Sequence, residues 1–307
     1  MKAARIHRFG GPEVIVVEDV PRPNPVAGEV LVRVVAAGVG PWDALIREGK
    51  SKVSPPPPLT LGSDLSGVVE AVGPSVMEAK KGDEVYGVTN PQFCGADAEY
   101  AIASANMIAA KPQRLTHLEA ASVPVVAVTA WQMLFDYARP EAGQRVMILG
   151  AAGNVGAYAV HLAADANLHV IAIAGAKDID YVRSLGAEAA VDYQVSKFED
   201  AVRPVDVVID TVGGETRERS LGVLKRGGIL VSVVSTSPLP KRSDLRSVFF
   251  YAEVTTARLN SISKLIDSGK LVPQVGTVLP LREVRAAHQM LAGAPHRRGK
   301  IVLRVTD

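Results

Sequence analysis

The 307-residue sequence predicts an α/β protein with two domains, a parallel sheet connected by helices and a barrel-like β domain. The parallel sheet is predicted from residues 145–234, where strand-like apolar runs alternate with helix-like stretches, a pattern that forms right-handed crossovers. The β domain is predicted from residues 1–118, where short β-rich runs are divided by Pro and Gly. The chain length suits two domains of roughly 100–200 residues each.

Composition and charge indicate a soluble globular protein and exclude several kinds of partner. Hydrophobic residues make up 48% and charged residues 21%, and Lys plus Arg exceed Asp plus Glu by only 34 − 32 = 2. No basic run suits nucleic acid or an anionic membrane surface, and no stretch approaches the roughly 18 apolar residues that span a bilayer. Residues 1–11 lack an apolar signal core, so we expect a cytoplasmic protein with no membrane or nucleic-acid partner.

Cysteine and histidine usage argues against a metal site. Cys94 is the only cysteine, so no intrachain disulfide forms and a zinc cage built from two or more thiolates of this chain is excluded. The six histidines show no metal-binding spacing. We therefore predict no metal.

In the first half of the chain, four apolar runs predict strands. They are EVIVVEDV (13–20), EVLVRVVAAGV (29–39), DLSGVVEAVG (64–73) and DEVYGV (83–88). At 116–138 the apolar spacing becomes helical, and Thr116 followed by Glu119 is a helix-start signature. We therefore place a domain boundary after residue 118.

The second half alternates predicted strands and helices. The strands are 145–150, 169–174, 189–192, 205–211 and 228–234, and the helices are 154–166, 177–185 and 215–224. A further helix is predicted at 257–271, ended at Gly269, and a last strand at 299–305. Because that strand lies far along the chain from its expected partners, we expect the C-terminus to complete the first domain. The predicted domains are 1–118 with 268–307, and 119–267.

The stretch GAAGNVG (150–156) joins a predicted strand to a predicted helix, which is the context in which a glycine turn binds a diphosphate. Gly150 permits the tight turn, Gly153 lets the backbone approach phosphates, and Gly156 allows close packing of helix on strand. First-turn amides then point at the phosphates. A plain strand-to-helix corner is the alternative. The residues predicted to bind the dinucleotide here are Gly150, Ala151, Ala152, Gly153, Asn154, Val155 and Gly156.

About 20 residues beyond the turn, an acidic residue would hold the ribose 2′-hydroxyl of NAD. The chain has AGAKD (174–178) there, with Gly175 and Lys177 ahead of Asp178. A small gap with a lysine suits a 2′-phosphate better than a pair of ribose hydroxyls, so we predict NADPH as the cofactor. An ordinary solvated lysine is the alternative for Lys177, and Asp178 opposes the prediction if it turns toward the ribose.

Seven motifs in order along the chain resemble the medium-chain dehydrogenase/reductase superfamily, and within it the zinc-free quinone oxidoreductase branch. They are AAGVGPWDALIREG (36–49), LGSDLSGVVEAVG (61–73), GDEVYGV (82–88), TAWQML (129–134), GAAGNVGAYAVHLA (150–163), VDVVIDTVGG (205–214) and GKIVL (299–303). The resemblance implies a GroES-like, partly open β-barrel domain, a Rossmann domain and a nicotinamide cleft at their junction.

The resemblance also explains why no metal is predicted. Zinc-dependent alcohol dehydrogenases of the superfamily carry a Cys, a His-Glu pair and a further Cys or Asp in segments where this chain has Gly40, Ser63 with Asp64, and approximately Val125. That set does not hold zinc. Without a Lewis acid, conjugate hydride addition to an enone or quinone is easier than alcohol oxidation.

By the same resemblance, Thr129 would lie against the nicotinamide and Tyr193 near the adenosine ribose, with Val233, Phe249 and Phe250 close to the cofactor. A buried helix threonine bonded to the preceding turn is the alternative for Thr129.

The segment that includes Gly40, Trp42 and Asp43 is the candidate substrate pocket. It departs from the Asn, and often Tyr, that many quinone oxidoreductases of the branch carry here. Trp42 either forms the floor of the pocket or packs inside the barrel. Asp43 is either a general acid or the cap of the following helix. No catalytic acid or base is assigned.

Together these features predict an NADPH-dependent, zinc-independent oxidoreductase that transfers hydride to a quinone or a small α,β-unsaturated carbonyl. The alternatives are an enoyl-thioester reductase and a low-turnover NADPH-binding sensor or structural protein. We expect a homodimer, formed by strand 228–234 pairing across a two-fold edge.

Overall fold

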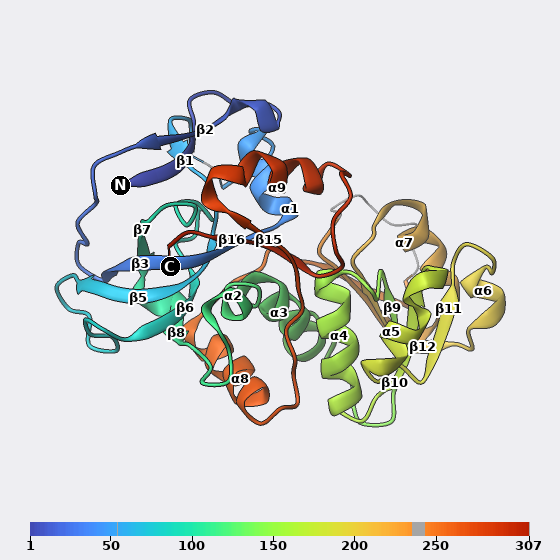
Figure 1. The fold of residues 1–307 in the computed structure, drawn as a ribbon. Helices are drawn as coiled ribbons and strands as arrows, with labels where there is room; N and C mark the ends of the chain where they lie inside the picture. The colour runs from blue at the N-terminus through green and yellow to red at the C-terminus, as the bar shows by residue number, and fades with distance from the viewer. Residues whose placement is uncertain (54, 235–242, 307) are drawn as a thin grey trace. The chain divides into compact units, whose positions relative to one another are not determined.

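The computed structural model describes residues 1–53, 55–234 and 243–306 of the chain (Figure 1). The chain divides into two compact units, Met1–Val125 with Val254–Asp307, and Val126–Glu253. The boundaries expected from the sequence come after residues 118 and 267. The difference is largest at helix α8 (Thr256–Asp267), which groups with the first unit.

Helix α8 is bonded to strands of the first unit. The Tyr86 hydroxyl donates to Leu259 O over 2.7 Å, and Thr256 Oγ1 donates to Ile108 O over 2.6 Å. These side chains explain why α8 belongs with the β-rich part of the chain.

The first unit contains a seven-stranded sheet and a three-stranded sheet. The larger sheet has the order β15-β16-β3-β5-β6-β8, and β7 also pairs with β3. Its strands are β3 (Glu29–Val39), β5 (Asp64–Val72), β6 (Glu84–Val88), β7 (Tyr100–Ser104), β8 (Ile108–Ala110), β15 (Val275–Pro280) and β16 (Lys300–Arg304). The smaller sheet pairs β1 (Lys2–Ile6) with β2 (Ile15–Asp19) and β4 (Leu59–Thr60). Both chain ends contribute to one core, which includes Ile6, Leu65 and Ile301.

Two sequence predictions for the first unit are confirmed. The C-terminal strand β16 returns to the β domain and pairs antiparallel with β3, with Ile301 opposite Val39. Thr116 caps α2 (His117–Ala120): its hydroxyl accepts the Glu119 amide over 3.3 Å, and the Glu119 carboxylate accepts the Thr116 amide over 2.8 Å.

The second unit is a six-stranded parallel sheet in the order β11-β10-β9-β12-β13-β14, as the predicted alternation of strands and helices requires. Its strands are β9 (Arg145–Leu149), β10 (His169–Ala174), β11 (Ala189–Asp192), β12 (Val205–Asp210), β13 (Leu224–Ser232) and β14 (Arg246–Phe249). The connecting helices are α4 (Asn154–Asp165), α5 (Ile179–Ser184), α6 (Phe198–Ala201) and α7 (Gly214–Ser220). Strand order reverses between β9 and β12, where an open α/β sheet leaves a crevice at its carboxyl edge.

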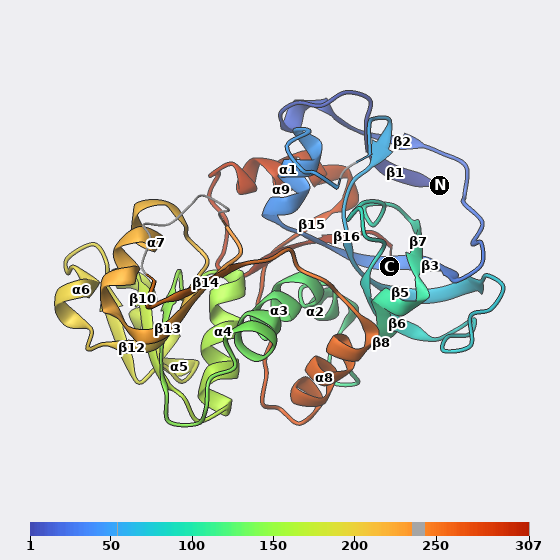
Figure 2. The same cartoon turned by 180° about the vertical axis from the view of Figure 1, so that it is seen from behind.

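Strand β14 corrects one prediction. It runs beside β13 (Figure 2) and pairs with it in parallel, with Leu230 opposite Ser247. The expectation that strand 228–234 offers a free edge for a dimer is therefore wrong, because β13 is bonded to β12 on one side and to β14 on the other. The four-residue run Arg246–Phe249 is half polar, so its sequence gives little strand signal.

Of the helices in the described ranges, none has both the length and the apolar character needed to cross a bilayer.

Candidate functional site

The glycine turn comes directly after β9, at the carboxyl edge of the parallel sheet. Gly150 has φ +70°, and a Cβ there would lie 2.5 Å from Thr211 Oγ1. Thr211 Oγ1 donates to Leu149 O over 2.7 Å. A side chain at position 150 would therefore be strained by its backbone conformation and would displace Thr211.

Gly156 brings helix α4 against the turn itself. A Cβ at Gly156 would lie 2.2 Å from Gly150 O and 2.9 Å from the Cα of Ala151. Helix α4 therefore approaches the backbone of the turn closely at Gly156, whereas the sequence suggests a close approach between the helix and the strand. Ala151 is buried, and its amide donates to Ile173 O over 3.1 Å.

Gly153 is the N-cap of α4 and is exposed. A Cβ there would have one neighbour within 4 Å, Gly150 O at 3.2 Å. The Ala157 amide donates to Gly153 O over 2.8 Å, so the amides of Asn154, Val155 and Gly156 precede the first bond of the helix. Three such amides beside an open glycine, at the positive end of the helix dipole, form a site that suits a diphosphate.

Asp210 holds the loop that faces the turn, although the sequence motifs do not single it out. Its Oδ1 accepts the amides of Val212 and Gly213 over 3.0 and 2.8 Å, and its Oδ2 accepts the Ser232 hydroxyl over 2.7 Å. Asp210 and Ser232 are both buried. An Asp that ends an apolar strand and is followed three residues later by Gly-Gly is the signal that would have found it.

The carboxyl ends of β10 and β11 lie side by side in the same sheet. A Cβ on Gly175 would lie 3.7 Å from Tyr193 Cε1, so the tyrosine ring stands beside the bare backbone of Gly175. Lys177 is exposed and Asp178 half-buried in the 3-10 turn Ala176–Asp178. Asp192 Oδ1 accepts the Gln194 amide over 3.0 Å, which fixes the start of the loop carrying Tyr193.

The remaining predicted cofactor residues are buried or half-buried, and two of them contact other aromatic rings. Phe250 is buried and stacks on Tyr137 with 4.4 Å between ring centroids, whereas Phe249 meets Tyr251 edge-on at 5.2 Å. Thr129 lies in α3 (Pro124–Trp131) with 4% of its surface exposed. Ala152, like Val233 after β13, is half-buried. Contacts of these residues with a cofactor stay predictions.

In the first unit, the predicted substrate residues lie at the start of α1 (Pro41–Arg47). Asp43 Oδ2 accepts the Gly40 amide over 2.7 Å, so Asp43 makes the capping contact. Asp43 is 1% exposed, and burial, followed by the charge of Asp97, raises its pKa well above the usual range. Its second oxygen, Oδ1, has no hydrogen-bond partner among the described residues.

Trp42 folds back over Gly40, where a Cβ would lie 2.3 Å from the indole Cη2. The indole N–H donates to Ser63 Oγ over 2.8 Å, and Lys300 Nζ lies 3.9 Å from the ring centroid. Lys300 is itself buried and forms an ion pair with Asp64 at 2.8 Å.

Two of the positions that the resemblance matches to zinc ligands, Ser63 and Asp64, make other hydrogen bonds here. Ser63 accepts the Trp42 indole, and Asp64 Oδ1 accepts the Val125 amide over 3.0 Å. Within residues 1–53, 55–234 and 243–306, no three His, Cys, Asp or Glu side chains gather as a metal-binding group.

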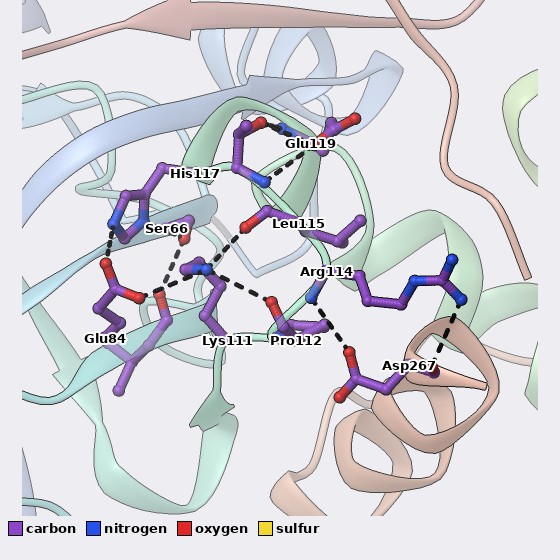
Figure 3. Close-up of polar contacts among 11 residues, drawn as sticks. Ser66, Glu84, Lys111, Pro112, Arg114, Leu115, His117, Glu119 and Asp267 are labelled. Atoms are coloured by element: carbon purple, nitrogen blue, oxygen red, sulfur yellow. Dashed lines mark hydrogen bonds and ion pairs between the residues drawn. The ribbon is translucent and has the colours of Figure 1, made fainter. Parts of the chain in front are cut away.

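Figure 3 shows a second polar cluster in the first unit. Ser66 Oγ lies 2.7 Å from His117 Nδ1, and His117 Nε2 lies 3.2 Å from Glu84 Oε1. Lys111 Nζ lies 3.4 Å from Glu84 Oε2. The order serine, histidine, carboxylate is that of a hydrolase triad. Ser66, however, is fully buried, and its Oγ also lies 2.9 Å from Val85 O, so the cluster packs α2 against β5 and β6 and presents no nucleophile.

Comparisons with known proteins agree with this architecture. Residues 26–113 match the alcohol dehydrogenase GroES-like domain, and residues 185–303 match a zinc-binding dehydrogenase domain. The chain is 31% identical to a quinone oxidoreductase of Sus scrofa, over 99% of this chain and 97% of the relative. It is similar to the structure of the quinone oxidoreductase from Coxiella burnetii, with a TM-score of 0.91, 33% identity and coverage of 100% and 99% of the two chains. A mycobacterial protein solved in complex with NADPH gives a TM-score of 0.88 at 28% identity, with 99% and 100% covered.

Proposed function

Because the chain belongs to the quinone oxidoreductase branch of the medium-chain dehydrogenase/reductase superfamily, we propose that it is an NADPH-dependent, zinc-independent enzyme that reduces quinones or small α,β-unsaturated carbonyls. Membership of the branch makes it an oxidoreductase that uses a nicotinamide cofactor. The choice of NADPH, the acceptor and the independence from zinc are the proposed parts.

The observation that carries the proposal is the open amide cradle at the start of α4. Gly153 leaves space where a side chain would stand, and Gly150 and Gly156 hold the turn against the helix. A diphosphate fits this cradle because each oxygen is a strong acceptor and the first-turn amides are donors. Asp210 supports the facing loop through two amide bonds.

NADPH is favoured by the residues at the carboxyl end of β10. Gly175 stands where a carboxylate would hold the two ribose hydroxyls of NADH, and the exposed Lys177 lies two residues further. An ammonium attracts a 2′-phosphate, and the mycobacterial relative was solved with NADPH.

Zinc independence is proposed from the residue types at the ligand positions. Gly40 and Val125 have no ligating atom in their side chains, and the Ser63 hydroxyl is a poor substitute for an imidazole. Conjugate reduction suits such a site, because the charge that develops on the acceptor oxygen is stabilised by hydrogen bonds or water.

The chemistry divides simply between cofactor and protein. When bound, NADPH supplies the hydride, and a solvent proton completes the reduced acceptor. The chain binds the diphosphate at the glycine turn, selects the cofactor near Gly175 and orients the acceptor. No side chain is assigned as proton donor.

The test is the loss of NADPH absorbance with a quinone, an enone and an enoyl thioester as separate acceptors. Turnover with the quinone or the enone is expected. Turnover confined to the enoyl thioester would make the chain an enoyl-thioester reductase, and tight NADPH binding without turnover on any acceptor would make it a sensor or structural protein.

A further inference from the structure

The half-buried Trp42 ring is held from three directions by its own unit. Lys300 Nζ lies 3.9 Å from its centroid, Ser63 Oγ accepts its N–H over 2.8 Å, and the absence of a Cβ on Gly40 leaves room for its edge. An indole with one hydrogen bond and one cation against its face has little freedom to rotate about χ1 and χ2.

The ammonium is held by a buried ion pair. Lys300 is 1% exposed and Asp64 is fully buried, and their charged atoms lie 2.8 Å apart. Asp64 is in turn fixed by the Val125 amide over 3.0 Å. A buried lysine needs such a partner, because an unpaired buried charge is strongly disfavoured.

We propose that Trp42 is an aromatic platform on which the flat ring of a quinone stacks, and that Lys300, Asp64 and Ser63 are positioning residues that hold the platform in place. The proposal rests on the proposed function and names the acceptor class within it. Its physical basis is that an immobilised indole that keeps part of its surface exposed gains stacking contact with a planar ring at small entropic cost.

The platform predicts discrimination between acceptors by shape. A naphthoquinone covers much of an indole face, whereas a short open-chain enone such as but-3-en-2-one covers little of it. Loss of the ring is therefore expected to raise KM for the naphthoquinone by roughly tenfold, since aromatic pairs are worth about 0.5–1.5 kcal/mol beyond the area they bury. KM for the enone is expected to change by less than about twofold.

Binding is tested without turnover by fluorescence. The chain has two tryptophans, so Trp131→Phe leaves Trp42 as the only reporter, and Trp42→Phe leaves Trp131. In Trp131→Phe, 1,4-naphthoquinone is expected to quench the Trp42 fluorescence along a curve that saturates as the quinone concentration rises. In Trp42→Phe, quenching is expected to stay linear, as for free N-acetyltryptophanamide. Linear quenching in both variants would overturn the platform.

Kinetics test the positioning residues. Trp42→Leu should raise KM for 1,4-naphthoquinone far more than KM for but-3-en-2-one, and it should leave the Kd of NADPH unchanged. Lys300→Met alone would leave Asp64 buried and unpaired, so the test uses Lys300→Met combined with Asp64→Asn, which removes both charges. This double variant is expected to raise KM for 1,4-naphthoquinone, as Trp42→Leu does. Lys300→Arg keeps the positive charge and is expected to keep this KM near the wild-type value. Equal losses on both acceptors would overturn the proposal. Saturating quenching with no quinone turnover would retain the platform and refute the proposed function.

Discussion

Replacing Asp97 by Asn should make the stability of the first unit less dependent on pH, so that the variant gains stability relative to wild type as pH rises from 5 to 8. Asp97 is fully buried, and neither carboxylate oxygen has a hydrogen-bond partner among the described residues. Burial first, and then the charge of Asp64, raise its pKa from 3.8 to about 7, while the Lys300 ammonium opposes the change. Asp43 also faces this group, since the charge of Asp97 raises the pKa of Asp43.

Proton binding sets the sign of the effect. Between pH 3.8 and about 7 the folded protein holds a proton on Asp97 that the unfolded chain has lost, so the free energy of unfolding falls as pH rises through this window. At about 1.4 kcal/mol per pH unit, the loss over the whole window is on the order of 4 kcal/mol. It is complete above about pH 7, where both states are ionised.

The assay is urea unfolding of wild type and Asp97→Asn at pH 5 and pH 8. Trp42 fluorescence in a Trp131→Phe background reports on the first unit alone, which avoids assuming that both units unfold together. Because Asn does not titrate, the stability of the variant relative to wild type should rise by about 3 kcal/mol between the two pH values. Glu78→Gln, at an exposed carboxylate of the first unit, is the control. If the curves of wild type and Asp97→Asn run parallel across pH, the role given to Asp97 is wrong.

Three further predictions concern the second unit and the metal. Lys177→Ala should lower kcat/KM for NADPH by several-fold to about tenfold and leave NADH nearly unchanged, because only NADPH carries the 2′-phosphate; equal losses for both cofactors would remove Lys177 from the site. Asp210→Ala should lower the melting temperature and weaken NADPH binding, because the Val212 and Gly213 amides and the Ser232 hydroxyl lose their acceptor; unchanged NADPH affinity in the folded variant would contradict its supporting role. The purified enzyme should keep its activity in EDTA and contain no stoichiometric zinc by elemental analysis, whereas zinc that tracks activity would refute the zinc-free proposal.

The parallel sheet was predictable because its local signals agree with its tertiary packing. Strands 169–174 and 189–192 have the predicted bounds, since each is an apolar run ended by turn residues. The α-helical part of the predicted helix 215–224 ends at Ser220, and a 3-10 turn continues to Val223, because the chain enters β13 at Leu224 and pairs there with Val205. Because Val205 lies on another strand, no local sequence pattern indicates where the helix ends.

The candidate site was predictable only where backbone conformation demands a residue type. Gly150 and Gly156 are required by a positive φ and by close backbone contacts, and both appear as glycines in a recognisable strand-turn-helix context. Contacts between side chains distant in sequence leave no such pattern. Lys300 against the Trp42 ring, and Ser232 bonded to Asp210, come together only when the chain is folded.

The most direct test of the central claim is a calorimetric titration of NADPH into wild type and Gly153→Val. The valine would stand beside the first-turn amides of α4, where the diphosphate is proposed to bind, and its Cβ would lie 3.2 Å from Gly150 O, a tight contact that a small shift of the turn relieves. Gly153 has φ −74°, so valine fits the backbone and the variant should keep its fold, checked by circular dichroism. We predict saturable binding to wild type and a loss of more than about a hundredfold in affinity for the variant. Equal NADPH affinity in the two folded proteins would show that GAAGNVG is a plain corner and would contradict the proposed cofactor site.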